Sequence, residues 1–431
     1  MKYRSCKCKA YLVTKGDILA GSRQVEHSHE NNVAKVIAKN SIARMKKEID
    51  ERNLTPAAAL AVVAADLSGE VMMALPDKGL VKRTLRRHRQ GNQNVSGSSL
   101  PPVPVDTTFV IPDQFRDMLL FDSGPGEHRM IIFGRQELLN AFGRSSFWIA
   151  DGTFKVVPSL FFQMYTIHFQ FTEGITPAAL YCLLPNKTRL TYDAILREVQ
   201  NLIPQAQPET ILTDFETAAM SAFRQCYPQA HVRGCYFHLC QSVMRKVQEV
   251  GLKAQYEVDS ELRGFVRSLS AISHVPINDV PDAFDTLVEI APAVEHLDEV
   301  ITYFEHSYVR GRRLRGRGEN FAPPLFPPEV WNQHTAAAQG IARTTNTCEG
   351  WHHGVQSLFQ CSHPTMWKFL EGIRQDSAVQ VASFLQASAG SYRATERRYR
   401  ILKEKVQRAV ATYGLTDTLT YLRSLAHLSY A

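Results

Sequence analysis

Three acidic residues stand where their carboxylates could bind divalent metal ions. Asp151 follows the apolar run FWIA at 147–150, Asp214 follows TILT at 210–213, and each run is typical of a buried strand. Glu349 lies in the polar stretch RTTNTCEGWHH, which opens a predicted helix. Two-metal phosphoryl transfer requires converging oxygen ligands, and a carboxylate at a strand end is held rigidly while it still reaches solvent. We therefore predict Asp151, Asp214 and Glu349 as catalytic residues and as ligands of two Mg²⁺ or Mn²⁺ ions.

The spacing of these carboxylates leaves a plainer interpretation open. The chain contains 42 Asp and Glu residues, so many sets of three arise by chance. An aspartate at the end of a strand is also more often a turn or helix-cap residue than a metal ligand. The choice between metal ligands and turn or helix-cap residues therefore depends on the elements that position the carboxylates and on the sequence around them.

The segment 106–251 has the alternating pattern of an α/β fold. Apolar and β-branched runs predict the strands, and amphipathic stripes predict the helices, the first of them capped by Thr191. The expected order is three strands, then helix, strand, helix, strand and helix, which is the order of a ribonuclease-H-like fold. The predicted strands are 147–150, 160–171, 176–184, 210–213 and 230–236, and the predicted helices are 191–203, 216–226 and 241–250.

Two helical segments follow this α/β core in the sequence. Residues 252–340 are predicted to be a helical insertion, which interrupts the core before the segment 341–362 that carries Glu349. Residues 363–431 are predicted to form a helical C-terminal region.

The positive charge of the chain is concentrated at its start. Residues 1–99 contain 18 Lys and Arg against 9 Asp and Glu, whereas the remainder contains 31 against 33. Such a basic module suits a polyanion, nucleic acid above all, and the alternative is a solvated basic surface without a partner.

The pattern from 31 to 91 predicts helices that end in a basic one. An alanine-rich helix is expected to reach about Leu75, and a turn at 76–79 precedes the last helix. A helix-turn-helix-like DNA-binding region is one interpretation, and a basic amphipathic surface helix is the other. A Gly, Ser and Pro-rich linker is predicted at 92–105. The expected apolar face of the last helix is Leu80, Val81, Thr84 and Leu85, and its expected DNA-binding face is Lys82, Arg83, Arg86, Arg87 and Arg89.

Composition narrows the class of protein further. An apolar content of 44% is ordinary for a globular protein, and the longest apolar runs are too short to cross a membrane. No apolar segment follows Met1, so no secretory signal is predicted. Eight cysteines scattered along 431 residues favour a reducing compartment over a disulfide framework. We expect a soluble intracellular protein.

Several motifs between residues 100 and 370 resemble the transposase domain of Mutator-like elements (MULE). They are FWIADGTFKVVP, LLPNKTRLTY, ILTDFETAAMSAF and VRGCYFHLCQSVMRKV between 147 and 247, followed by YFEHSYV, WNQ and RTTNTCEGWH. The resemblance implies a ribonuclease-H-like core, split by a helical insertion, with an Asp, Asp, Glu triad. The matching positions of this chain are Asp151, Asp214 and Glu349.

The activity that this resemblance implies is that of a DNA transposase. Such an enzyme hydrolyses a phosphodiester at a transposon end and transfers the strand into target DNA. Its expected partners are double-stranded DNA, both terminal inverted repeats and target, and further copies of itself on that DNA, in the nucleus. Two alternatives remain open: a domesticated, non-cleaving DNA-binding or regulatory protein, and a ribonuclease-H-like nuclease that acts on RNA or a hybrid.

Cysteine and histidine residues provide two candidate zinc sites. Cys235 and His238 match the Cys-x-x-His motif of the family, but a structural zinc needs four ligands, so we expect them to pack beside the active site. Residues 1–30 resemble the end of a FLYWCH zinc finger whose upstream half is missing. The residues that would bind zinc there are Cys6, Cys8, His27 and His29, and the alternative is that they are unligated.

A second arginine cluster lies inside the predicted insertion. We predict that it contacts the DNA backbone, with a steep loss of affinity in salt, and the alternative is a solvated arginine loop. The cluster consists of Arg310, Arg312, Arg313, Arg315 and Arg317.

Overall fold

The structure, a computed structural model, divides into two compact units, Met1–Pro102 and Val103–Ala431. The described residues are 11–15, 18–23, 33–52, 56–93, 100–172, 174–314, 321–341, 346–390 and 397–428. Within the part of the chain that the structure describes, none of the helices is long and apolar enough to cross a membrane.

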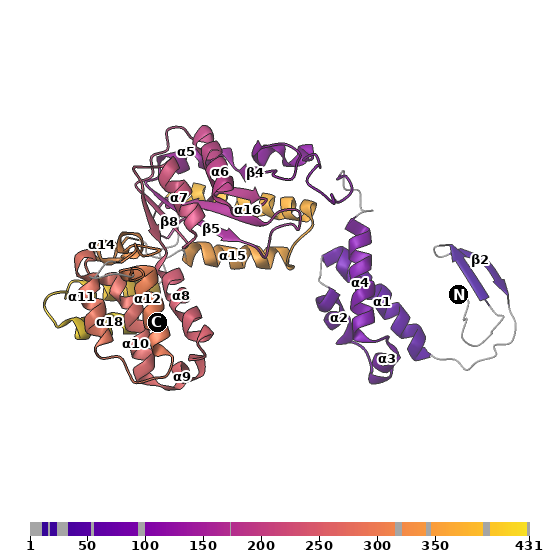
Figure 1. Ribbon diagram of the computed structural model, residues 1–431. Coiled ribbons are helices and arrows are strands. Elements are labelled where there is room, and N and C mark those ends of the chain that lie inside the picture. Colours follow the sequence, from indigo (N-terminus) through magenta and orange to yellow (C-terminus); the bar gives the residue numbers. More distant parts are fainter. Residues whose placement is uncertain are drawn as a thin grey trace. The chain divides into compact units, whose positions relative to one another are not determined.

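The first unit contains an antiparallel hairpin and four helices (Figure 1). Its core is a small apolar cluster of Met45, Ile49, Ala59, Val63, Val81 and Leu85. The elements are β1 (Tyr11–Lys15), β2 (Ile18–Arg23), α1 (Val33–Arg52), α2 (Pro56–Ala64), α3 (Gly69–Ala74) and α4 (Lys78–Gln93).

Two details of this unit differ from the sequence prediction. The alanine-rich helix breaks after Ala64, and its expected end forms the separate helix α3. Among the side chains of α4 that the structure describes, Val81 and Leu85 are buried, whereas Leu80 is 53% exposed and Thr84 is also exposed. A helix in so small a core buries a single row of side chains at i and i+4, so the neighbouring row faces solvent.

The second unit is built on a seven-stranded sheet with the order β3-β4-β7-β6-β5-β8-β9. The neighbouring strands β3, β4, β7, β6 and β5 pair antiparallel in that order. Strands β5, β8 and β9 run parallel to one another. The strands are β3 (Leu119–Asp122), β4 (Ile131–Gly134), β5 (Phe147–Thr153), β6 (Gln163–Phe169), β7 (Ala178–Leu184), β8 (Thr210–Thr213) and β9 (His231–Gly234).

One face of the sheet, called here the α6 face, is covered by helices with apolar stripes. Trp148 of β5 contacts Phe142 with a ring-centroid distance of 4.3 Å and Tyr227 with one of 5.0 Å. The cap of α6 is Thr188, whose hydroxyl accepts a hydrogen bond from the Thr191 amide, so Thr191 lies inside the helix and is not its cap. The helices that follow the strands are α5 (Gln136–Arg144), α6 (Arg189–Leu202), α7 (Thr217–Cys226) and α8 (Tyr236–Glu249).

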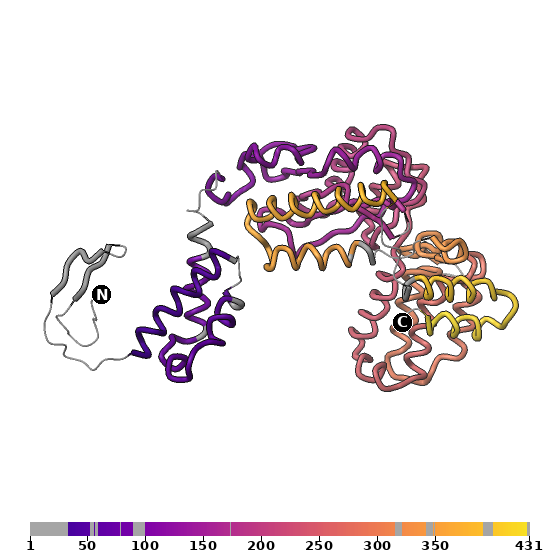
Figure 2. Tube along the Cα trace, turned by 180° about the vertical axis from the view of Figure 1, so that it is seen from behind, coloured from indigo at the N-terminus to yellow at the C-terminus, as the bar shows by residue number. Residues whose placement is uncertain are grey.

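The opposite face, called here the α15 face, is covered by two helices from much later in the chain. They are α15 (Asn346–Phe359) and α16 (Met366–Ser388), which lie side by side over the strands in Figures 1 and 2. Gly372 lets these helices approach closely, because a Cβ there would lie only 2.1 Å from the Phe359 ring. Cys348 of α15 is buried against β5 and β8 in a cluster with Phe147, Ile149, Leu212 and Cys235.

The predicted insertion is helical among its described residues and packs with the end of the chain. Tyr421 donates a hydrogen bond to the His274 carbonyl at 2.6 Å, and Tyr413 donates one to Asp279 at 2.7 Å. The C-terminal pair α17 (Arg397–Val410) and α18 (Thr418–Leu428) therefore belongs to the helical layer formed by the insertion (Figure 2). The insertion contains α9 (Lys253–Val258), α10 (Ser260–Ala271), η2 (Ile272–His274), η3 (Ile277–Asp279), α11 (Val280–Val288), α12 (Leu297–Phe304), the π-helical η4 (Glu305–Val309), α13 (Pro328–Trp331) and α14 (His334–Gln339).

The helical layer is attached to the sheet through a buried polar contact. Arg233 of β9 donates to the side chain of Gln333, whose amide in turn donates to the Gly234 carbonyl at 3.1 Å. Gly234 is required there, because a Cβ would lie 2.4 Å from the Phe215 ring. The WNQ motif thus fixes the insertion to the edge of the sheet.

Candidate active site at the edge of the sheet

Asp151 and Asp214 lie side by side because of the register between two parallel strands. Phe147 pairs with Thr210 and Ile149 pairs with Leu212, so the same offset brings Asp151 level with Asp214. Neighbouring strands are about 4.8 Å apart, and the two aspartates therefore share one edge of the sheet. Asp151 is 5% exposed, and Asp214 is only partly exposed. The structure thus brings two of the three predicted carboxylates together.

The electrostatics of this edge disfavour uncompensated negative charge. Burial raises the pKa of Asp214, against the opposing effects of His238 and of a hydrogen bond from the Thr213 hydroxyl. Burial also raises the pKa of Glu216, and the charge of Asp214 raises it further. Carboxylates that lose hydration and repel each other are stabilised in their charged form by a bound cation. Glu216 is a residue of this site that the prediction of the triad left out.

A histidine side chain lies near each of the two aspartates. His352 Nδ1 of α15 lies 3.5 Å from Asp151 Oδ2. Burial, with the charges of His353 and His238, lowers the pKa of His352 to about 4, so its ring is neutral at pH 7. Burial likewise lowers the pKa of His238, although the charge of Asp214 opposes this shift. The site therefore gains no fixed positive charge from these rings.

Glu349 is placed only by its backbone, because its side chain lies outside what the structure describes. Residue 349 follows the buried Cys348 and precedes His352 by three positions on α15. Residues three apart share one side of a helix, so residue 349 belongs to the side of α15 on which His352 reaches Asp151. Whether its carboxylate meets the other two stays a prediction.

A half-buried carboxylate anchors α15 to the sheet. Asp376 of α16 accepts hydrogen bonds from the Trp351 indole at 2.9 Å and from the Tyr181 hydroxyl at 2.6 Å. Burial raises the pKa of Asp376, and the hydrogen bonds oppose this rise. The Trp351 ring also lies against His168 of β6, with centroids 5.0 Å apart. Sequence reasoning missed Asp376, and its one signal was a carboxylate within the apolar stripe of a helix.

The candidate zinc ligands fall into two groups. Cys235 is buried in the apolar cluster with Cys348, and His238 lies beside Asp214. Among the described side chains, no group of three or more His, Cys, Asp or Glu residues could hold a metal ion. Cys6, Cys8, His27 and His29 lie outside the described residues.

Most of the predicted DNA-contacting residues of α4 face solvent. On α4, Arg83, Arg86 and Arg87 are exposed and Lys82 is half-buried, while the side chain of Arg89 is not described.

The arginine cluster of the insertion is only partly available to a ligand. Arg310 forms ion pairs with Asp285 and with Glu305, the latter at 3.4 Å, and lies 5.9 Å from the centre of the Phe284 ring. Arg310 is thus engaged within the protein, which the charge pattern did not reveal. Arg312 and Arg313 are exposed, and Arg315 and Arg317 lie outside the described residues.

Comparison with known families identifies the segment that carries this site. Residues 147–242 match the MULE transposase domain, which runs here from β5 into α8 and includes Asp151, Asp214, Cys235 and His238. Glu349 lies beyond the matched segment. A comparison with curated proteins gives no match. The part of the sheet that holds the two aspartates is thus similar to the MULE transposase domain.

Proposed function

We propose that this protein is a DNA transposase of the DDE type, which uses Asp151, Asp214 and Glu349 to hold two Mg²⁺ or Mn²⁺ ions. The observation that carries the proposal is a pair of carboxylates, the buried Asp151 and the partly exposed Asp214, which the register of the parallel strands β5 and β8 brings level with each other, within the segment that matches the MULE transposase domain. The element order from β5 to α8 supports the ribonuclease-H-like core that such an enzyme uses. We further propose that it acts as a homo-oligomer on paired DNA ends in the nucleus.

The donor set suits hard divalent cations. Carboxylate oxygens are the ligands that Mg²⁺ and Mn²⁺ prefer, and burial raises the pKa values of Asp214 and Glu216, so a bound cation would stabilise their charged forms. When bound, two such ions supply activation of the attacking oxygen and stabilisation of the leaving oxygen. Asp151 lies within β5, where the Gly152 amide donates to its Oδ1 at 2.9 Å, and Asp214 directly follows β8.

Strand cleavage and transfer by the purified full-length protein test this function. The substrates are a supercoiled plasmid and a duplex oligonucleotide with a free 3′-OH, with Mg²⁺ or Mn²⁺. We expect Asp214→Asn to abolish both activities and chelation by EDTA to do the same. Asp298→Asn, at an exposed position in the first turn of α12, is the matched control and should retain activity.

Each outcome separates the proposal from its alternatives. Cleavage that survives in Asp214→Asn removes Asp214 from the site. Tight DNA binding by a wild-type protein without any metal-dependent cleavage supports the domesticated, non-cleaving alternative. Hydrolysis of RNA or of a hybrid without strand transfer supports the nuclease.

Binding of the DNA ends by α4 has its own test. Replacing the exposed Arg83, Arg86 and Arg87 by alanine should weaken duplex binding and flatten its salt dependence. The slope of log K against log salt should fall by roughly 0.9 for each phosphate contact that is lost. Arg423→Ala, an exposed arginine on α18, is the control. An unchanged slope would assign α4 to a solvated surface.

A further inference from the structure

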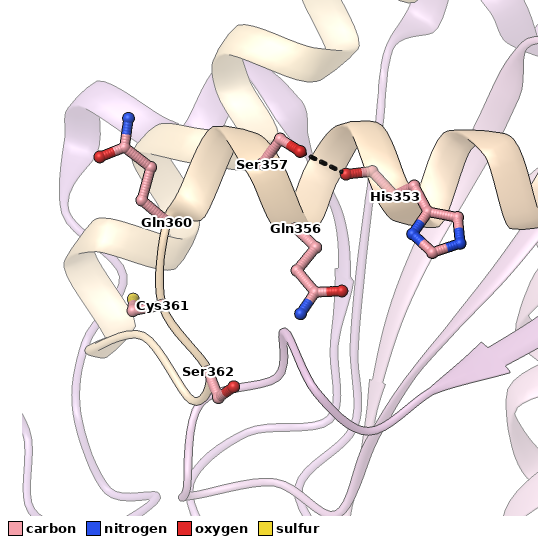
Figure 3. Close-up of a pocket in the computed structure, with 6 residues that line it drawn as sticks. All are labelled: His353, Gln356, Ser357, Gln360, Cys361 and Ser362. Atoms are coloured by element: carbon pink, nitrogen blue, oxygen red, sulfur yellow. Dashed lines mark hydrogen bonds between the residues drawn. The ribbon is translucent and has the colours of Figure 1, made fainter.

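A polar pocket lies along α15 beyond the position of Glu349. Its volume is about 390 Å³, and Figure 3 shows its lining residues on α15 and on the turn that follows the helix. The lining contains amide, hydroxyl, thiol and imidazole groups and no carboxylate, although the acidic pair lies near the start of the same helix. The lining residues are His353, Gln356, Ser357, Gln360, Cys361 and Ser362.

The pocket continues the side of α15 that carries Glu349. Positions 349, 353 and 356 are separated by four and three residues, which places them in one row along α15, and Gln360 is the first residue after the helix. At the end of the row, Gln360 and His363 adopt positive φ angles of 52° and 47°, and the chain turns back beside the helix. This row leads away from the catalytic edge.

The residue after the pocket-lining Ser362 is bound to the loop that follows Asp151. The His363 amide donates to the Lys155 carbonyl at 2.9 Å, and His363 Nδ1 lies 3.2 Å from the Val157 carbonyl. Lys155 is exposed on this loop. The loop that carries Lys155 and follows Asp151 is therefore joined to the turn that ends the pocket.

An exposed aromatic pair stands on the same loop. Phe154 is 44% exposed, Phe162 is 46% exposed, and their ring centroids are 5.4 Å apart at an interplanar angle of 77°. Phe154 comes three residues after Asp151. Two large rings left open to solvent beside an acidic site contribute little to the core, and they offer faces on which a base can stack.

We propose that this surface binds an unpaired stretch of DNA next to the bond that is cut. A base stacks on the Phe154 and Phe162 rings, Lys155 contacts a phosphate, and the amides and hydroxyls of the pocket donate to and accept from a neighbouring nucleotide. Unpaired DNA fits better than duplex, because the faces of paired bases are closed to a side chain. The absence of carboxylates in the pocket lining suits a polyanion. The identification of the ligand as DNA rests on the proposed function.

Equilibrium binding of a fluorescent single-stranded DNA oligonucleotide to the full-length protein tests the site. EDTA is present, so no cleavage occurs and binding is measured alone. Phe154→Leu and Phe162→Leu should each weaken binding about 5-fold or more, since a stacked base contributes ~1–3 kcal/mol. Phe154→Trp should bind as the wild type does. Leu415→Ala, at a position that is 80% exposed, is the control and should leave binding unchanged.

A charge variant and modified oligonucleotides extend the test. Gln356→Glu puts a carboxylate into the pocket and should weaken binding, whereas Gln248→Glu at an exposed position of α8 should not. An oligonucleotide with one abasic position should lose affinity for the wild type but not for Phe154→Leu. Both single variants binding as tightly as the wild type would overturn the site, and tighter binding of an RNA of the same sequence would overturn its assignment to DNA.

The site and the proposed function fail in different ways. Cleavage by the wild type, with single-strand binding that is insensitive to Phe154 and Gln356, keeps the function and removes the site. Single-strand binding that depends on both residues, in a protein without metal-dependent cleavage, keeps the site and removes the transposase.

Discussion

The two faces of the central sheet are made by alternate residues of the same strands, yet they carry different chemistry. On the α6 face, Trp148 and its neighbours pack against apolar helices. On the α15 face, the buried groups include Asp151, His168 and the Tyr181 hydroxyl. A strand that is buried on both sides appears as a continuous apolar run. The α6 face also contains a buried polar residue, Gln163, but its amide donates to the Tyr192 hydroxyl of α6 and so serves packing. The polar residues of the α15 face include Asp151 of the candidate site.

The strongest test of this comparison is Asp151→Asn. If Asp151 holds a metal ion as proposed, this change should lower the rate of strand cleavage roughly 10³-fold or more, equivalent to ~4 kcal/mol of transition-state stabilisation. The free energy of unfolding should stay the same or rise, because a buried carboxylate is replaced by a neutral amide. Cleavage kinetics and urea unfolding measure the two effects. A stability loss that accounts for the lost activity would contradict the comparison.

Trp148→Ala on the α6 face should show the reverse pattern. The side chain is 0% exposed and packs between Phe142 and Tyr227, so its removal leaves a large cavity. Such substitutions destabilise by ~3–5 kcal/mol. Thermal and denaturant unfolding should register this loss, while the folded fraction should retain the cleavage rate per molecule. An unfolding free energy equal to that of the wild type would contradict the assignment of the α6 face to stability.

The α15 face should also make stability depend on pH through His168. Burial lowers the pKa of His168 to about 3, whereas an unfolded histidine titrates near 6.5. Between these values the unfolded chain binds a proton that the folded chain does not, so stability falls as pH falls, by up to ~1.4 kcal/mol per pH unit.

Replacing His168 by methionine isolates this contribution. The unfolding free energy of the wild type should fall relative to that of His168→Met as pH drops from 6.5 to 4. The α6-face variant Trp148→Phe should leave the pH dependence unaltered. Parallel curves for wild type and His168→Met would show that the ring is protonated in the folded state.

The smallest expected effect concerns the anchor between α15 and α16. Trp351→Phe removes the hydrogen bond to Asp376 while keeping an aromatic ring against His168. We expect roughly a tenfold loss of cleavage rate, ~1.4 kcal/mol, because the helix that carries residue 349 is held less firmly. Trp367→Phe, on α16 and packed against Phe109, is the control. Equal activity in both variants would reduce the anchor to a packing contact.

Sequence reasoning succeeded where the pattern was local. The order of five strands and their following helices agrees with the structure, because apolar runs and 3.6-residue stripes reflect burial directly. The positions of Asp151 and Asp214 followed from these runs. The four-residue strands β3 and β4 and the helix α5 were not predicted individually, since short edge elements have weak patterns.

The features that sequence reasoning could not supply depend on contacts between distant segments. Arg310 belongs to a charged run, and only the fold shows that Asp285 and Glu305 engage it. The role of Asp376 depends on a tryptophan 25 positions earlier and a tyrosine 195 positions earlier. Val81 is buried and Leu80 is exposed because the small core of the first unit is wide enough for only one of them.

The late position of α15 and α16 in the chain has a consequence for synthesis. The sheet edge with both aspartates is complete once β9 has left the ribosome, but the helices that cover its second face come after the whole insertion. At ~5–20 residues per second, the ribosome needs roughly 8 to 31 s for the 154 residues between β9 and the end of α16. During that interval Phe147, Ile149 and Leu212 lack the partner that buries them, Cys348. Nascent chains would then depend on chaperones at this stage, and any product that stops before α15 would be both inactive and prone to aggregation.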